Sequence, residues 1–186
     1  MNNKIVTLCA IVICFLAVTS SCVLGVEGKK HAPLSRNDKF SGIEVFNSIT
    51  LYYTPGDSLQ WSVKASPRLK SKLQMYVEDD RLKIGADGMR GDDEIEIWLM
   101  APAVSTFTAW VNGTIVVTDS LEVNTLSVTT YNLSEIRFDG EVRAAYADLS
   151  AYNNSLIYME SGYFSENHIL TSGDGEVRGN IDCARE

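Results

Sequence analysis

The sequence is short of basic residues and of histidine, and each shortage excludes a class of protein. Its 186 residues contain 16 Lys+Arg against 24 Asp+Glu, for a formal net charge of −8 at pH 7. No nucleic-acid partner is expected, because phosphate recognition needs a basic surface. The two histidines, His31 and His168, lie far apart, and no HExxH, GxSxG or P-loop pattern is present. We therefore expect no catalytic residues, no metal site and no cofactor, and we interpret acidic segments such as Asp92-Asp93-Glu94 as solvated surface.

Long hydrophobic runs are also scarce, and the one that occurs lies at the N-terminus. It extends from Ile5 to Val18, about 14 residues, whereas a membrane-spanning helix needs about 20. Such a run followed by small residues is typical of a secretory signal, so residues 1–21 are predicted to be a signal peptide. Thr19-Ser20-Ser21-Cys22 resembles a bacterial lipobox, in which the cysteine is lipidated and the chain is cut just before it. An ordinary secretory signal, cut a few residues later, is the alternative.

Lipidation of Cys22 predicts an exported protein that its lipid anchors to the membrane of the bacterial cell envelope. Residues 22–39 contain Gly, Pro and polar residues without a period, and are predicted to form the lipidated N-terminus and a flexible tether. Once the signal peptide is removed and Cys22 is blocked, Cys183 is the one cysteine left in the sequence. No internal disulfide is then possible, and the fold must be stable without cross-links.

Helical periodicity is absent from residue 40 onward, and alternating patterns rich in β-branched residues recur in its place. Examples are Ile43–Val45, Leu82–Ile84 and Glu94–Met100, with turn signals such as Pro55-Gly56-Asp57 between such segments. Many short strands separated by turns indicate an all-β protein without helices. Residues 40–182 are predicted to form a single domain with its own core.

The second half of the sequence contains a repeat. Asn or Gly, then a small residue and an aliphatic one, recur at a steady interval around Thr114, Ser134, Ser155 and Gly175. Asn and Gly tolerate positive φ angles, so each unit is predicted to turn a corner at the same phase. Stacked coils share a core that one coil cannot bury alone, which predicts a β-solenoid with coils of about 20 residues. The Asn-x-Ser/Thr pattern also matches N-glycosylation, but the even spacing favours corner chemistry.

Tyr131 and Tyr152 lie at the same phase of this repeat, each directly before an Asn. Stacked coils would place the two rings one above the other, near the spacing of neighbouring strands. Such a ladder serves packing, which we favour, or presents aromatic rings to a sugar. Tyr131 and Tyr152 are therefore the weak candidates for a ligand-binding site.

Several segments, in order along the chain, resemble one known family. Phe40-Ser-Gly-Ile-Glu-Val45 resembles its opening phrase, and Val77–Ile84 and Ile95–Ile115 resemble later passages. This family is the head GIN domain family of auto-transporter adhesins, and the resemblance covers residues 40–180. It implies a right-handed β-solenoid or β-helix-like fold, export, no catalytic residues and an adhesin-like role. The sequence departs from the family at the corners, where Asn-Gly-Thr, Asn-Leu-Ser and Asn-Asn-Ser replace Gly-Ser-Gly.

The leading hypothesis is a non-enzymatic lipoprotein of the cell envelope whose solenoid surface serves adhesion or scaffolding, with an envelope protein or a glycan as partner. A glycan-binding module that uses Tyr131 and Tyr152 is the alternative. A β-helix carbohydrate-active enzyme is less favoured, although carboxylates distant in sequence can pair in such folds. An uncapped end of the solenoid would also permit edge pairing into a homo-oligomer.

Overall fold

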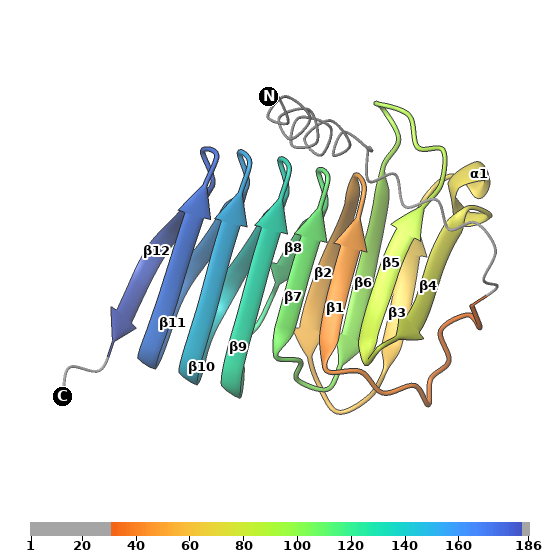
Figure 1. Ribbon diagram of the computed structural model, residues 1–186. Helices are drawn as coiled ribbons and strands as arrows, with labels where there is room; N and C mark the ends of the chain where they lie inside the picture. Colours follow the sequence, from red (N-terminus) through yellow and green to blue (C-terminus); the bar gives the residue numbers. More distant parts are fainter. Residues whose placement is uncertain (1–30, 184–186) are drawn as a thin grey trace, which may run out of the picture. The chain divides into compact units, whose positions relative to one another are not determined.

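The computed structural model describes residues 31–183, which contain twelve strands joined in one sheet and one short helix (Figure 1). The predicted all-β class is confirmed. The predicted signal peptide of residues 1–21, Cys22 and the first part of the predicted tether lie outside the described residues. The elements are β1 (Gly42–Phe46), β2 (Ile49–Pro55), β3 (Gln60–Lys64), α1 (Pro67–Lys70), β4 (Leu73–Glu78), β5 (Arg81–Ala86), β6 (Ile95–Ala101), β7 (Thr106–Trp110), β8 (Thr114–Val117), β9 (Leu121–Tyr131), β10 (Glu135–Tyr152), β11 (Leu156–Ser172) and β12 (Glu176–Cys183).

The prediction that the domain has no helix is wrong for the four-residue helix α1. The hydroxyl of Ser66 caps its N-terminus by accepting a hydrogen bond from the Leu69 N–H at 3.3 Å, and Pro67 occupies the first turn. Both are ordinary helix-start residues. A single turn is too short to produce a helical period in the sequence, so periodicity could not reveal it.

Strand pairing in the described residues is parallel throughout, except for the antiparallel pairs β3–β6 and β4–β5. In the second half the chain returns beside itself at a nearly constant interval. Thr114 lies opposite Glu135, which lies opposite Leu156, which lies opposite Glu176. Neighbouring strands in this half are therefore successive copies of one repeat.

Four corners lie side by side where β7, β9, β10 and β11 end (Figure 1). Each contains two consecutive residues with positive φ: Val111–Asn112, Asn132–Leu133, Asn153–Asn154 and Gly173–Asp174. Every pair includes an Asn or a Gly, as predicted, but Val111, Leu133 and Asp174 also adopt positive φ, whereas Gly113 and Gly175 do not. Backbone N–H groups of the corners continue the hydrogen bonding between neighbouring strands; for example, the Asn132 N–H donates to the Tyr152 carbonyl at 3.2 Å. The paired αL residues turn the chain without interrupting its hydrogen bonding.

The predicted alignment of the first corner is wrong by one residue. Gly113, not Thr114, lies in line with Ser134, Ser155 and Gly175, because Thr114 is opposite Glu135. This position crowds the preceding coil: a Cβ added to Gly175 would lie 2.2 Å from the Ala151 carbonyl oxygen. At Gly175 the backbone comes too close for a Cβ, whereas at Ser134 and Ser155 it leaves room for one, and their hydroxyls donate to the carbonyls of Ala109 and Thr130.

The core lies between the inward-facing rows of these strands. Rows of aliphatic and aromatic side chains run across neighbouring strands in register, and many members are fully buried. One such row, from β1 to β10, has an exposed fraction of 0% at every position: Ile43, Phe107, Val128 and Leu149. Burial of this kind stabilises by about 25 cal/mol per Å² of apolar surface. Within residues 31–183 the one cysteine, Cys183, is free, so this packing acts there without a disulfide.

Residues 31–39, the described part of the predicted tether, contact the domain. The Leu34 side chain is buried, and its N–H donates to the Met75 carbonyl at 2.8 Å. The His31 ring stacks on Tyr76 with centroids 4.0 Å apart. This segment therefore covers part of β4, and the predicted tether over residues 22–30 remains a prediction.

Candidate functional site

The structure brings Tyr131 and Tyr152 together, as their common phase predicted, with ring centroids 5.0 Å apart and planes 9° apart. The stack is longer than the sequence suggested. Trp110 lies 4.1 Å from Tyr131 on its other side, and Phe46 lies 6.3 Å from Trp110. Trp110 and Phe46 escaped detection because the first corner begins with Val111 rather than Asn. The signal for Trp110 is its place directly before that corner.

The stacking decides which ring faces are available to a ligand. Both faces of Tyr131 are covered, by Trp110 and by Tyr152. A sugar ring stacks on a free aromatic face, so Tyr131 cannot serve as a platform. Burial raises the pKa of the Tyr131 hydroxyl, as expected for a packed ring. One face of the Tyr152 ring is turned toward Tyr131, and on its other side Ser172 is the residue opposite Tyr152 on the neighbouring strand β11. This geometry favours packing for the ladder.

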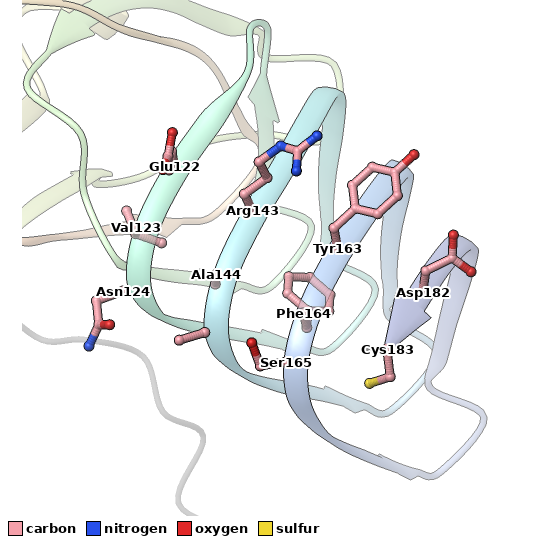
Figure 2. Close-up of a pocket in the computed structure, with 11 residues that line it drawn as sticks. Glu122, Val123, Asn124, Arg143, Ala144, Tyr163, Phe164, Ser165, Asp182 and Cys183 are labelled. Carbon is pink, nitrogen blue, oxygen red and sulfur yellow. The ribbon is translucent and has the colours of Figure 1, made fainter. Parts of the chain in front are cut away.

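A shallow groove of about 950 Å³ crosses β9 to β12 (Figure 2). Its outer row consists of residues in register on neighbouring strands, which Figure 2 shows side by side: Glu122, Arg143, Tyr163 and Asp182. The apolar part of the lining includes Ala144 and Phe164, which are largely buried. Asn124 and Ser165 add an amide and a hydroxyl at the bend of the strands.

Tyr163 and Arg143 dominate the groove. The Tyr163 side chain is 41% exposed, and the Arg143 guanidinium carbon lies 5.0 Å from the centre of its ring. Arg143 also donates from Nε to a Glu141 carboxylate oxygen at 2.5 Å. This hydrogen bond raises the pKa of Arg143 and orients its guanidinium. The arrangement places an exposed aromatic ring beside charged and polar groups.

Sequence reasoning missed the groove because its residues come from four strands. Arg143 and Tyr163 are separated by one repeat length, so they are neighbours only when the repeat register is known. The spacing of one repeat length between Arg143 and Tyr163 was the sequence signal that could have predicted their contact.

A second exposed apolar surface lies on β2 and β6, and we call it the Trp98 patch. Trp98 is 42% exposed and stacks on Tyr52 with centroids 5.4 Å apart. Met100, two residues further along β6, is 40% exposed. Large exposed side chains that cluster in this way are typical of contact surfaces.

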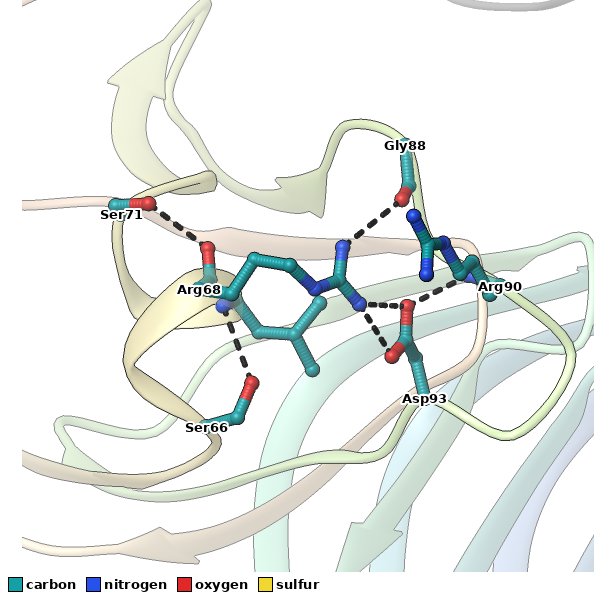
Figure 3. A network of polar contacts seen from close by, with 7 residues as sticks. Ser66, Arg68, Ser71, Gly88, Arg90 and Asp93 are labelled. Carbon is teal, nitrogen blue, oxygen red and sulfur yellow. Dashed lines mark hydrogen bonds and ion pairs between the residues drawn. The ribbon is translucent and has the colours of Figure 1, made fainter.

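The acidic segment at residues 92–94 has a structural role (Figure 3). The Asp93 carboxylate accepts hydrogen bonds from the Arg68 guanidinium and from the Arg90 N–H, the latter at 2.6 Å. The Arg68 hydrogen bond, aided by Arg90, lowers the pKa of Asp93. Arg68 also donates to the Gly88 carbonyl at 3.4 Å. The network therefore fastens the β5–β6 loop to α1.

The described histidines are not arranged for catalysis. His31 stacks on Tyr76, and the exposed His168 lies 3.5 Å from an Asp148 carboxylate oxygen. Over residues 31–183 no group of three or more His, Cys, Asp or Glu side chains could hold a metal ion. No helix in that same range is long and apolar enough to cross a membrane.

The fold over the described residues is that of an all-β domain. The chain belongs to the family described as "Putative auto-transporter adhesin, head GIN domain", whose model matches residues 39–182. The family resemblance noted in the sequence is thereby confirmed. Membership indicates an extracellular or envelope protein, and the family description is that of an adhesin, not of an enzyme. No curated protein matches the chain.

Solved structures with a similar fold come from Parabacteroides species. One is described as a "putative lipid binding protein" from Parabacteroides distasonis ATCC 8503, with a TM-score of 0.65 and 16% identity over 77% of this chain and 64% of that one. A "putative adhesin" from the same organism has a TM-score of 0.55 and 14% identity, over 74% of this chain and 67% of that one. A "putative adhesin" from Parabacteroides merdae ATCC 43184 has a TM-score of 0.57 and 13% identity, over 78% of each chain. At these identities the likeness concerns the fold alone. The chain spans less than two thirds of the first structure's length.

Proposed function

We propose that the protein is a non-enzymatic, adhesin-like module of the bacterial cell envelope that binds a neutral glycan in the groove of Arg143 and Tyr163. The observation that carries the proposal is the exposed Tyr163 ring, held by Arg143 within a groove of about 950 Å³. Membership of an adhesin family supports a binding role.

The chemistry of the groove favours sugar over other ligands. Aromatic rings contact the apolar face of a sugar, and carboxylates, amides and hydroxyls bind its hydroxyl groups. Glu122, Asp182, Asn124 and Ser165 supply these polar groups around Tyr163. Because the carboxylates in and beside the groove outnumber its one cation, an anionic glycan would be repelled.

We infer that the fold is a β-solenoid, right-handed as the family resemblance implies. Parallel pairing at a nearly constant offset of one repeat supports stacked coils, each unable to bury its core alone. A column of coils supplies a groove that runs across strands, which suits an extended chain of sugars.

We further propose that a lipid on Cys22 holds the module at the membrane of the envelope. The Cys22→Ala variant should leave the membrane fraction and should lose incorporation of radiolabelled palmitate. Unchanged fractionation with unchanged labelling would contradict the anchor, and would leave the proposal for the groove as it stands.

The groove is tested with the full chain in mild detergent against panels of neutral and anionic polysaccharides. We expect binding to neutral chains, lost at least about tenfold in Tyr163→Ala, because the variant removes both the stacking of the ring and the apolar area that it buries. Tyr158→Ala is the matched control, since Tyr158 lies on the same strand but outside the groove. Equal losses in both variants, or binding to anionic chains only, would refute the site. Release of new reducing ends from a bound glycan would refute the non-enzymatic role.

A protein partner is the second candidate, and the exposed Trp98 patch favours it. Trp is enriched at the energetic centres of protein interfaces. Envelope proteins captured by the wild-type chain but not by Trp98→Ala would support this function. Capture that is lost only in Tyr163→Ala would assign the contact to the groove.

A further inference from the structure

The two ends of the described domain differ in how they are covered. At the N-terminal end, α1 contributes the buried Leu69, and Leu34 bonds to the edge strand β4. At the other end, β12 pairs with β11 only, and the part of β11 after Phe164 has no strand beyond it among residues 31–183. Ile169 is consequently 44% exposed, although Leu149 opposite it on β10 is 0% exposed. The core is open at this end.

The backbone of β12 presents unpaired groups at the same end. The Glu176 N–H donates to the Ser155 carbonyl at 2.8 Å, so Glu176 and Arg178 direct their backbone groups toward β11. Alternation along a strand then points the N–H and C=O of Val177 outward, away from β11. An open edge of this kind accepts another strand.

The charges around Val177 are self-complementary when two copies of the strand are aligned antiparallel. Gly175-Glu176-Val177-Arg178-Gly179 places an acid and a base on either side of Val177, with a glycine beyond each. The Glu176 and Arg178 side chains are both exposed on the outer face and form an ion pair with each other along the strand, while Val177 packs against the core. In an antiparallel pair centred on Val177, each Glu176 would face an Arg178 across the two strands.

We propose that β12 pairs with β12 of a second copy of this chain, antiparallel, about a two-fold axis through Val177. The two Val177 residues exchange backbone hydrogen bonds, and two Glu176–Arg178 pairs flank them. The contact is isologous, as in most homodimers. Since the axis is perpendicular to the sheet, it also turns the two open core ends toward each other. The glycines at 175 and 179 lie opposite each other, so no side chain obstructs the approach.

The contact is small, because the strand segment is short. Stable interfaces usually bury about 1,200–2,000 Å², and a smaller one gives a dissociation constant in the micromolar range. The pairing does not use Arg143 or Tyr163, so it is independent of the proposed glycan site.

The test is size-exclusion chromatography with light scattering on the full chain in mild detergent, over about 5–200 µM. We expect a concentration-dependent dimer in the wild type. Arg178→Glu and Glu176→Arg should each weaken it at least about tenfold, through like charges facing each other. The exchanged variant, with both substitutions, should restore dimerisation. Arg137→Glu is the matched control, because Arg137 is exposed in the same row on β10 and lies away from the edge.

Folding of each variant is checked by circular dichroism. If one charge variant unfolds, Val177→Pro serves instead, because it removes the outward N–H while the bonds to β11 come from Glu176 and Arg178. A wild-type monomer at all concentrations would overturn the proposal. So would a dimer that survives Arg178→Glu, one that the exchanged variant fails to restore, or one that Arg137→Glu weakens equally.

Discussion

The corner serine Ser155 offers the sharpest test of how neighbouring strands are joined at the corners. Its side chain is 3% exposed, and its Oγ accepts a hydrogen bond from the Tyr152 N–H at 3.0 Å. The same hydroxyl donates to the Thr130 carbonyl at 3.1 Å and lies 2.8 Å from the Thr130 Oγ1. Ser155 therefore connects its own corner to the neighbouring strand β9.

The Ser155→Ala variant removes these bonds and leaves buried polar groups on both coils without their partner. Each net hydrogen bond is worth about 1 kcal/mol, and an orphaned buried group costs about 1–3 kcal/mol, so we expect a loss of about 2–3 kcal/mol. For a chain of this size each kcal/mol lowers the melting temperature by about 2–4 °C, which gives a decrease of about 4–12 °C.

Urea and thermal unfolding followed by circular dichroism measure the effect of Ser155→Ala. Ser165→Ala is the control, because Ser165 is exposed and should change stability by less than about 0.5 kcal/mol. A loss in Ser155→Ala no larger than that of the control would refute the reasoning, since the buried hydroxyl would then contribute nothing to the corner.

Three further predictions concern single positions. Burial raises the pKa of Tyr53 to about 12, so its neutral phenol stabilises the fold below pH 10. We expect the free energy of unfolding of the wild type to fall by about 2–3 kcal/mol between pH 10 and 12. Tyr53→Phe should lack this loss in alkaline unfolding curves. Arg68 lowers the pKa of Asp93, so the stability that this pair adds above the ordinary Asp pKa should be lost as the pH drops through the lowered value. Asp93→Asn should therefore make the free energy of unfolding depend less on pH in the acid range. An unchanged dependence on acid pH would count against the network in Figure 3. Gly175→Ala should prevent the last coil from closing, because the new Cβ would lie 2.2 Å from the Ala151 carbonyl oxygen, and unfolding curves matching the wild type would contradict this.

The sequence by itself determined the all-β class and the segments in which the chain turns, although not the exact alignment of the first corner. Both depend on local properties: alternation follows from the two-residue period of a strand, and Asn132, Asn153 and Gly173 accept positive φ wherever they stand. The family followed from short phrases that a local comparison can match. The pairing of Tyr131 with Tyr152 followed from their common phase.

Only the tertiary structure decided the register, and with it every surface that spans several strands. Whether Gly113 or Thr114 belongs to the corner row depends on contacts with residues one coil away, which no local preference encodes. The same holds for the full aromatic ladder, for the groove in which Arg143 meets Tyr163, and for the exposure of Ile169 at the open end. A strand's side chains acquire neighbours from other strands only when those strands are placed beside one another, and that placement is a property of the whole core.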